Sequence, residues 1–219
     1  MVMTKGQSFY NDKGVFKKVS ITVLAVVVIA LLIIMLLISR EIGREDSKRI
    51  TDNGDLNQNG IVEEYILEKQ ELTVYEDNKL IWKSPKEYNI DSFALADVNN
   101  DGNINLVISL WKYGSFGNAK PFWQQAEQDQ EYKNHLFIYS LSEKGFKQVW
   151  CSSNLVRPIV EFSITDINGD GLNELVVEEG KYKYKYKNIY TLDTKAPTST
   201  NVFEWSEWGF LKKEKERIY

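Results

Sequence analysis

The sequence predicts an all-β domain that follows a single membrane-spanning helix. Three observations predict this fold class: a long apolar run near the N-terminus, a loop motif that occurs three times, and short apolar segments on either side of each loop. Beyond the N-terminal run, aromatic and β-branched residues dominate the apolar set, and these residues favour strands over helices. About 180 residues follow the run, enough for one domain with a sizeable core.

The apolar run at residues 19–38 is long enough to cross a bilayer. It carries no charge, and at about 1.5 Å per residue a helix of this length spans about 30 Å, the thickness of the hydrocarbon core. A cleaved signal peptide would have a shorter apolar region that ends in a small-x-small site, and this run has no such ending. We expect a signal anchor at 19–38, a cytoplasmic segment at 1–18, a juxtamembrane linker at 39–50 and an extracytoplasmic domain at 51–219.

Composition narrows the classes of function. The part after the apolar run is more acidic than the whole chain, whose net charge is −4, which argues against nucleic acid as a partner and suits cation binding. Cys151 is the only cysteine, so no intramolecular disulfide is possible. His135 is the only histidine, which leaves little material for a zinc site or a nucleophile–histidine pair, so the sequence does not indicate an enzyme.

One loop pattern occurs three times, with oxygen-bearing side chains at positions 1, 3, 5 and 9 and glycine at position 6. The sets are Asp55, Asn57, Asn59 and Glu63; Asp97, Asn99, Asp101 and Asn105; and Asp166, Asn168, Asp170 and Glu174. Alternate positions of a tight loop converge on one centre, and Ca²⁺ takes about six to eight oxygen ligands. We therefore expect two to three Ca²⁺ sites. The alternative is three turns rich in Asn and Asp that hold no metal.

The segments after these loops distinguish them from EF-hands. An EF-hand loop has an acidic ligand at position 12 and continues into a helix. Position 12 here is Ile66, Ile108 and Val177, and the segments 106–111 and 175–177 have the apolar character of buried strands. Each motif therefore predicts a strand, a loop and a second strand.

With its flanking strands, the pattern D-x-[DN]-x-[DN]-G-x-x-[DEN] resembles the FG-GAP/VCBS repeat family, whose repeats form the blades of integrin-α-type β-propellers. The resemblance covers most of residues 50–219, and it implies calcium ligation by the position 1, 3, 5 and 9 side chains of the second and third loops. The first loop departs from the pattern, with Asn59 where aspartate is usual and Glu64 where leucine follows the other loops. Because the family has many binding roles and includes some enzymes, the resemblance indicates fold more strongly than function.

Four strands are expected in each repeat, which makes one repeat one propeller blade. The expected strands are 64–68, 72–76, 79–83 and 91–96; 106–111, 136–141, 146–151 and 158–165; and 175–179, 182–192, 201–205 and 208–212. Three blades are few for a closed ring. A three-blade arc, a partial fourth blade from residues 44–54, and a six-blade ring shared by two copies of the chain all remain open.

Two segments are candidate binding surfaces. A long insertion at 112–134 is rich in aromatic residues that could stack on sugar rings or peptide side chains, or could instead fold back onto the blade. The candidate ligand-binding residues are Trp111, Tyr113, Phe116, Phe122 and Trp123. The segment 181–187 alternates lysine and tyrosine, which could bind an anionic polymer or lipid head groups, or could simply protect a sheet edge.

The sequence therefore favours a calcium-binding module on the outer face of a cell membrane that binds a protein or an envelope glycan. An accessory subunit of an envelope enzyme or assembly complex is the alternative, and a carboxylate-based hydrolase is a third hypothesis. The basic residues on the two sides of the apolar run nearly balance, so they do not decide its orientation. The loop motifs favour an N-terminus inside the cell, because they suit the calcium concentration found outside it.

Overall fold

The computed structural model describes residues 49–115 and 130–213, together with five helical residues near the N-terminus: Val26, Ile29, Leu31, Ile34 and Met35. The chain forms two compact units, Met1–Ser47 and Lys48–Tyr219. The five helical residues of the first unit are all exposed, and most of the expected span at 19–38 lies outside the described residues. Among the described residues, no helix has the length and apolar character needed to cross a membrane.

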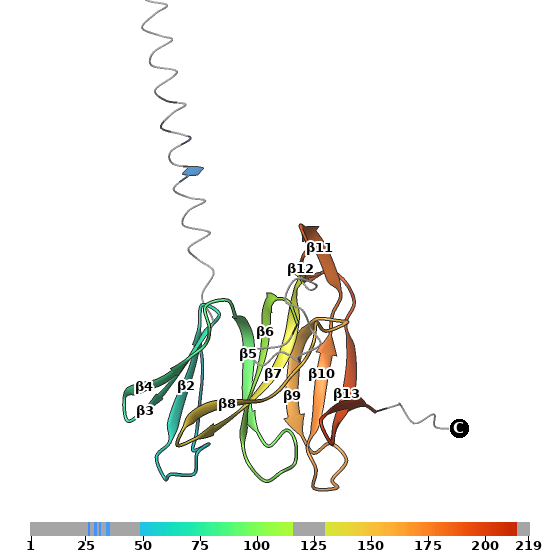
Figure 1. Ribbon diagram of the computed structural model, residues 1–219. Coiled ribbons are helices and arrows are strands. Elements are labelled where there is room, and N and C mark those ends of the chain that lie inside the picture. Colours follow the sequence, from blue (N-terminus) through green and yellow to red (C-terminus); the bar gives the residue numbers. More distant parts are fainter. Residues whose placement is uncertain are drawn as a thin grey trace, which may run out of the picture. The chain divides into compact units, whose positions relative to one another are not determined.

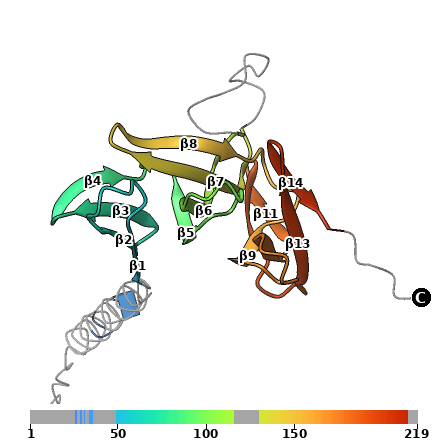
Figure 2. The same ribbon diagram turned by 90° about the horizontal axis from the view of Figure 1, so that it is seen from below.

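The second unit is all-β, and its described strands form three separate sheets (Figures 1 and 2). The first sheet contains β1 (Ile50–Gly54), β2 (Glu63–Glu68), β3 (Glu71–Glu76) and β4 (Lys79–Lys83), in that order. The second contains β5 (Asn89–Ala96), β6 (Asn105–Tyr113), β7 (Tyr132–Ser142) and β8 (Gly145–Cys151). The third contains β9 (Ile159–Thr165), β10 (Glu174–Glu179), β13 (Ser199–Ser206) and β14 (Gly209–Lys212).

A hairpin extends the second sheet at one end. Its strands are β11 (Tyr182–Tyr186) and β12 (Ile189–Leu192), and β12 pairs with the start of β7 through Ile189 and Tyr132. The sequence predicted one continuous strand over 182–192, which is wrong, because the chain reverses at Lys187 and Asn188 with φ of 44° and 62°. Two successive positive φ angles make the turn type that best suits a two-residue hairpin.

Each sequence motif joins the first and second strands of one sheet. The loops at 55–62, 97–104 and 166–173 connect β1 to β2, β5 to β6 and β9 to β10, and each connected pair is antiparallel. Each sheet therefore begins one strand earlier than the predicted repeat unit. Residues 50–54 are the first strand of the first sheet, so they do not start a fourth blade.

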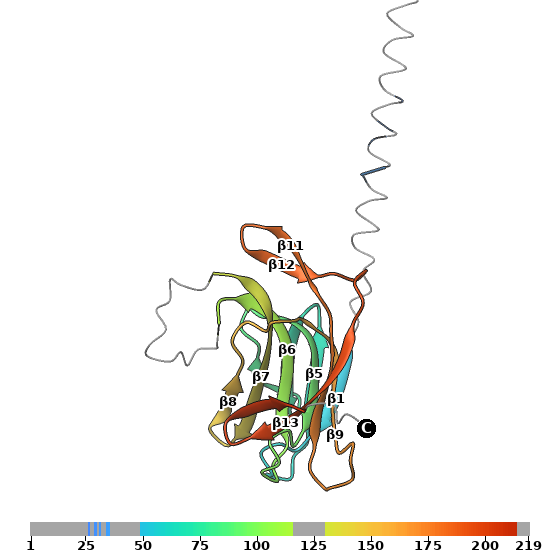
Figure 3. The same ribbon diagram turned by 90° about the vertical axis from the view of Figure 1, so that its right-hand side faces the viewer.

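The loops and the hairpin lie at opposite edges of the second unit. Strand β7 runs from Tyr132, beside the hairpin, to Ser142, so the two edges are separated by the length of this strand. Figures 1 and 3 show the three loops together at the bottom, which we call the loop edge. The hairpin and the start of β1 lie at the top, which we call the hairpin edge.

The second sheet is buried on both faces, since it packs between the other two. In β6, Leu106, Ile108 and Leu110 belong to the apolar cluster shared with the first sheet, whereas Val107 belongs to the cluster shared with the third. This explains the nearly continuous apolar run of β6, which is typical of strands covered on both sides. We call the two contacts between sheets the first and the second interface.

The outward faces of the first and third sheets are polar. Glu64 and Glu68 alternate with buried residues along β2, and Glu161, Ser163 and Thr165 are exposed along β9. This alternation is usual for an antiparallel sheet with one face in water. The apolar surface of the three sheets is thus concentrated in the two interfaces between them.

Candidate functional site

The three loops at the loop edge share one backbone conformation. At loop position 4, φ is 55°, 56° and 78° in the first, second and third loops, and at position 6 it is 86°, 87° and 86°. Position 6 is Gly60, Gly102 and Gly171, and an added Cβ at any of them would meet no atom within 4 Å. The dihedral angle, rather than lack of space, is therefore what requires glycine there.

The aspartate at position 1 closes each loop by accepting backbone hydrogen bonds. In the second loop, Asp97 Oδ1 accepts from the N–H of Asp101 at 3.1 Å and its Oδ2 accepts from the N–H of Gly102 at 2.8 Å. Asp55 and Asp166 accept the equivalent bonds in the other loops. The bond from Gly171, with further backbone bonds, lowers the pKa of Asp166 despite some desolvation. Such bonds from backbone N–H groups to an aspartate side chain are typical of tight turns.

The second loop contains buried oxygen atoms that lack donors. The amide nitrogen of Asn99 donates to Asp101 Oδ2 at 2.8 Å, while its Oδ1 is buried without a hydrogen-bond partner. The same is true of Oδ1 of Asn105, a residue that is only 1 % exposed. An unsatisfied buried acceptor costs about 1–3 kcal/mol. These oxygens, in a loop that also carries two carboxylates, are the ligand type that a hard cation prefers.

The charge of Asp101 fits this interpretation. Burial alone would raise the pKa of Asp101, but hydrogen bonds from Asn99 and Asn103 outweigh it and the pKa is lowered. The carboxylate therefore stays ionised at neutral pH.

The third loop already contains a cationic side chain. Glu174, at position 9, is 2 % exposed, and its Oε1 accepts from Lys213 Nζ at 3.1 Å and from the amide of Asn168 at 2.8 Å. Hydrogen bonds to Glu204 and Glu174 raise the pKa of Lys213, which keeps it charged. One of the four ligands that the family resemblance implies here is thus neutralised by the protein itself.

The first loop uses most of its side chains internally. The amide nitrogens of Asn57 and Asn59 both donate to Glu76 Oε1, at 3.0 and 2.9 Å, while their oxygens accept backbone N–H groups. Glu63 is fully buried and accepts from the N–H of Leu56 at 2.8 Å, and burial raises its pKa. Within residues 49–115 and 130–213, no three His, Cys, Asp or Glu side chains gather closely enough to hold a metal ion. A cation in any loop would therefore need asparagine or backbone oxygens as well.

Hydrogen bonds between loops connect neighbouring sheets. Asn100 in the second loop donates from Nδ2 to the carbonyl of Asn173 in the third at 3.1 Å, and its Oδ1 accepts from the N–H of Asn173 at 2.8 Å. Asn173 Nδ2 also donates to the carbonyl of Asp97 at 2.8 Å. A single bond, from Gln58 to Asn103, connects the first and second loops.

A cavity of about 440 Å³ opens in the second interface. Its wall combines residues of β7, β8, β9, β10, β13 and β14 with the connection that leads from β8 to β9. The apolar lining residues are Leu136, Trp150, Leu155, Val156, Ile159, Leu175, Val177, Phe203, Trp208 and Phe210. Val156 and Trp208 are the two most exposed large apolar residues of the described chain, at 92 % and 81 %.

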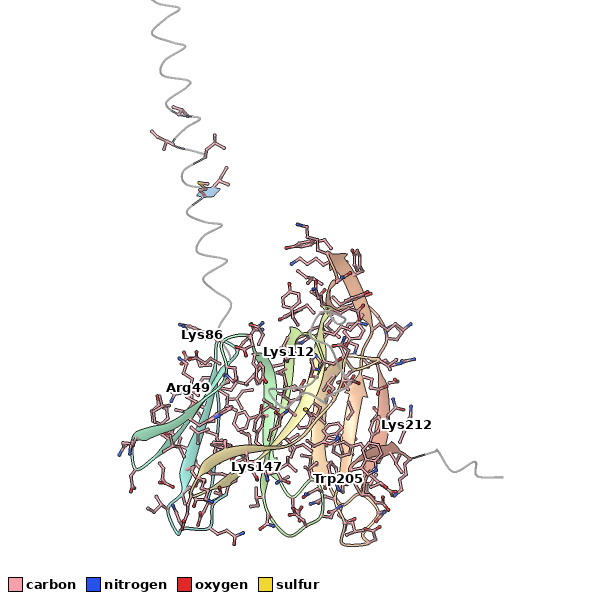
Figure 4. The ribbon with its side chains drawn as sticks, in the orientation of Figure 1. Arg49, Lys86, Lys112, Lys147, Trp205 and Lys212 are labelled. Atoms are coloured by element: carbon pink, nitrogen blue, oxygen red, sulfur yellow. The ribbon has the colours of Figure 1, made fainter. Side chains whose placement is uncertain are left out.

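The aromatic part of the cavity wall is fixed by ring contacts. Trp150 meets Phe210 edge-to-face with ring centroids 5.3 Å apart, and it meets Trp205, labelled in Figure 4, at 6.2 Å. Four polar residues line the wall: Ser152, Ser153 and the charged residues Arg157 and Glu179. Glu179 Oε2 accepts from the amide of Asn201 at 2.7 Å and lies 4.0 Å from Arg157 Nε. The cavity is therefore apolar with one charged pair, the usual character of a preformed binding site.

The residues that the sequence suggested for ligand binding are only partly described. Trp111 is 7 % exposed, stacks on Tyr132 with centroids 6.1 Å apart, and donates its indole N–H to Asp91, so it packs inward. Tyr113 is 55 % exposed, and Phe116, Phe122 and Trp123 lie outside the described residues. The cavity was not predicted from the sequence. Trp208, in the tight turn between β13 and β14, was a usable signal, because side chains in such turns are exposed.

No protein-family model, curated protein or solved structure matches this chain. The geometry of the loops and of the cavity is therefore the basis for assigning a function.

Proposed function

We propose that this chain is a membrane-anchored binding module, not an enzyme, and that it docks a partner protein on the outer face of a cell membrane through the cavity of the second interface. The exposure of Val156 and Trp208 at that cavity carries the proposal. Exposed apolar residues that border a preformed hollow are typical of protein-binding surfaces, where tryptophan and arginine contribute most of the affinity.

The chemistry of the cavity favours a protein over a glycan. Sugars need several hydrogen-bonding groups beside an aromatic ring, whereas the wall here is mostly aliphatic and aromatic with Arg157 and Glu179 as its charged members. An apolar side chain of a partner would cover Trp208, and burying one large side chain contributes about 1.5–3 kcal/mol. The charged pair would then orient the partner's backbone or a polar neighbour.

At the level of fold, the three sheets fit three β-propeller-like blades in an open arc. The three matching loops and the FG-GAP/VCBS resemblance support this interpretation. The polar outward faces of the first and third sheets favour an arc over a ring completed by a second copy, because blades of a ring pack through apolar faces.

Calcium has its best candidate site in the second loop, with Asp97, Asn99, Asp101 and Asn105 as ligands. A bound cation would satisfy the buried oxygens of Asn99 and Asn105 and hold the loop edge rigid. In the third loop, Lys213 supplies a positive charge to Glu174, so calcium would have to displace it or bind beside it. We therefore propose one calcium ion in the second loop, with weaker sites in the other two.

Site-specific photo-crosslinking in the full-length chain tests the docking proposal. A photoreactive amino acid at Val156 should capture one defined protein in intact cells, identified by mass spectrometry. The same group at Leu211 is the matched control, because Leu211 is also exposed, at 63 %, but does not line the cavity. Adding Trp208→Ala should abolish the adduct. An adduct of equal yield from both positions, or one unaffected by Trp208→Ala, would contradict the proposal.

A calcium titration of thermal unfolding tests the loop proposal. Millimolar calcium should raise the unfolding temperature of the full chain, because a ligand that binds only the folded state stabilises it. Asp97→Asn with Asp101→Asn should remove most of the shift, whereas Asp55→Asn in the first loop should leave most of it. An unfolding temperature that calcium does not change would rule out the metal site and leave the docking proposal intact.

A further inference from the structure

The hairpin β11–β12 carries a concentrated positive charge on an exposed edge. Lys181, Lys183, Lys185 and Lys187 are all exposed, and residues 181–192 contain no acidic residue. In the part of the chain that the structure describes, none of these four lysines forms an ion pair. The rest of the domain is acidic overall, so this hairpin differs in charge from its surroundings.

The hairpin is held in place by aromatic packing and, at its turn, by a backbone hydrogen bond. Tyr182 meets Trp111 edge-to-face at 5.9 Å, and its hydroxyl donates to the carbonyl of Leu155 at 3.0 Å. Lys133 Nζ lies 4.7 Å from the centroid of the Tyr190 ring, over its face. The N–H of Tyr132 donates to the carbonyl of Asn188, at the turn of the hairpin, at 2.9 Å. The lysines are therefore presented by an ordered element of the fold.

The outer part of the hairpin combines these lysines with exposed tyrosines. Tyr184 and Tyr186 are 59 % and 52 % exposed, and Tyr113, whose ring contacts Tyr132 at 5.1 Å, is 55 % exposed. Exposed tyrosine beside lysine is the composition found at membrane–water interfaces, where the ring enters the head-group region and the ammonium contacts phosphate.

The hairpin lies at the edge where the chain enters the domain. The start of β1 at Ile50 is at the hairpin edge, and the calcium loops are at the opposite edge (Figures 1 and 3). Residues 39–49 join the apolar run to β1, and a fully extended chain of that length reaches at most about 40 Å. A bilayer that holds the apolar run is therefore at most about 40 Å of chain away from this edge.

We propose that the β11–β12 hairpin contacts the head groups of anionic phospholipids and turns the hairpin edge of the domain toward the bilayer. This inference rests on the membrane anchor of the proposed function, and it adds a second, electrostatic attachment whose strength depends on lipid charge. The docking cavity and the calcium loops are then held in a defined orientation above the membrane.

The alternative explanation for these lysines is that they protect the edge of the sheet. β11 is the last strand of its sheet, and charge there prevents pairing with another chain. This alternative predicts that neutral hairpin variants self-associate, and that the lysines are equally accessible whatever the lipid. The two interpretations therefore give different results in one experiment.

The test uses the full-length chain reconstituted into vesicles of phosphatidylcholine alone, or with about one third phosphatidylglycerol. The lysines are modified briefly with an amine-reactive reagent, and the yield at each is read by mass spectrometry. We expect labelling of all four hairpin lysines, Lys181, Lys183, Lys185 and Lys187, to fall at least threefold in the anionic vesicles and to recover in high salt. Two exposed lysines away from the hairpin are internal controls and should label equally in both vesicles: Lys144, which borders a hollow with Asn57 and Asn103 of the loop edge, and Lys147, labelled in Figure 4.

Equal labelling of the hairpin lysines in both vesicles would overturn the inference. Protection by soluble polyphosphate without protection by anionic vesicles would assign the hairpin to a polymer instead, and would also overturn it. Flotation of the vesicles separates these results from a failure of the anchor: a chain that does not float with either vesicle contradicts the membrane anchor itself. A Lys183→Gln, Lys185→Gln, Lys187→Gln variant should still float, and it should lose the lipid-dependent protection of Lys181.

Discussion

The two interfaces of the domain are built differently, although one sheet takes part in both. The first interface contains a large apolar cluster, contributed by both sheets, that includes the fully buried Tyr65 and Leu72. Its hollow, about 540 Å³, lies at the loop edge and is lined mostly by polar residues, among them Asn57 and Asn103. The second contains a smaller buried cluster and leaves a cavity of about 440 Å³. Hydrogen bonds between Asn100, Asn173 and Asp97 connect its two sheets at the loop edge.

The difference supports the proposed separation of stability from binding within one fold. Close packing excludes ligands, since an interior at crystal density leaves no space for them. A partly filled interface buries less apolar surface, so burial stabilises it less. Hydrogen bonds at its rim then help to hold the two sheets together. We infer that the first interface provides most of the stability of the domain and the second provides the binding site.

Matched leucine substitutions should show the largest effect. Leu72 and Leu175 are both buried on central strands, at 0 % and 3 % exposure, but only Leu175 borders the cavity. We expect Leu72→Ala to lower the free energy of unfolding by about 3–5 kcal/mol and Leu175→Ala by about 2–3 kcal/mol, because fewer atoms surround Leu175. Urea unfolding measures both. Leu211→Ala, at an exposed site, should stay within about 0.5 kcal/mol, and equal losses at Leu72 and Leu175 would remove the proposed distinction.

Loss of the hydrogen bonds between the second and third loops should have the next largest effect. Asn100→Gly keeps the positive φ of 56° and removes both side-chain bonds to Asn173. The expected loss is about 1–3 kcal/mol, because it leaves partly buried groups of the third loop without partners. Hydrogen exchange should show that the third sheet opens more readily while the first is unchanged. Uniform loosening of all three sheets would mean that the loops do not hold the second interface separately.

Filling the cavity should stabilise the domain and weaken docking. Val177→Leu adds one methylene to a buried residue that lines the cavity. One buried methylene contributes up to about 0.8 kcal/mol, so a small rise in unfolding temperature is expected, together with a lower yield of the Val156 crosslink. A more stable variant that still gave the full crosslink yield would place the partner elsewhere.

Lowering the pH should reduce the contribution of Asp166, in the third loop, to the free energy of unfolding. This is the smallest of the four expected effects. Hydrogen bonds from Gly171 and its neighbours hold the pKa of Asp166 below its ordinary value of 3.8. A carboxylate with a lowered folded-state pKa stabilises the fold above 3.8, and this contribution is lost as the pH falls through the folded-state pKa. In a chelating buffer, Asp166→Asn should be less stable than the parent at pH 7, and the difference should shrink below pH 4. A difference that did not depend on pH would show that charge at Asp166 does not matter.

Much of this fold could be predicted from local sequence, because its signals are local. The period-two alternation of β2 and β3, the Asp77–Asn78 turn and the three loops each specify their own short segment, and the structure confirms the strands expected there. The break between β11 and β12 was missed because lysine and tyrosine alternate up to the turn, and Asn188 is its only residue typical of turns.

The site was less predictable, because it depends on contacts between distant segments. Loop spacing shows that Asp166 and Glu174 occupy the same loop positions as Asp97 and Asn105. It does not show that Lys213, far along the chain, forms an ion pair with Glu174. The cavity joins residues from β7 to β14, and no spacing along the chain marks them as neighbours. Which aromatic side chains are covered is decided by the packing of whole sheets, as Trp111 and Trp208 show in opposite ways.

The chain enters the domain at one edge and reaches the end of its described part near the other. β1 begins at the hairpin edge, whereas Lys213, the last described residue, contacts Glu174 beside the third loop. The sheets therefore act as a rigid spacer about one long strand in height, roughly 35 Å for a strand such as β7. A reporter fused directly after Lys213 would lie on the far side of this spacer from the start of β1, so such a fusion can display cargo without crowding the hairpin.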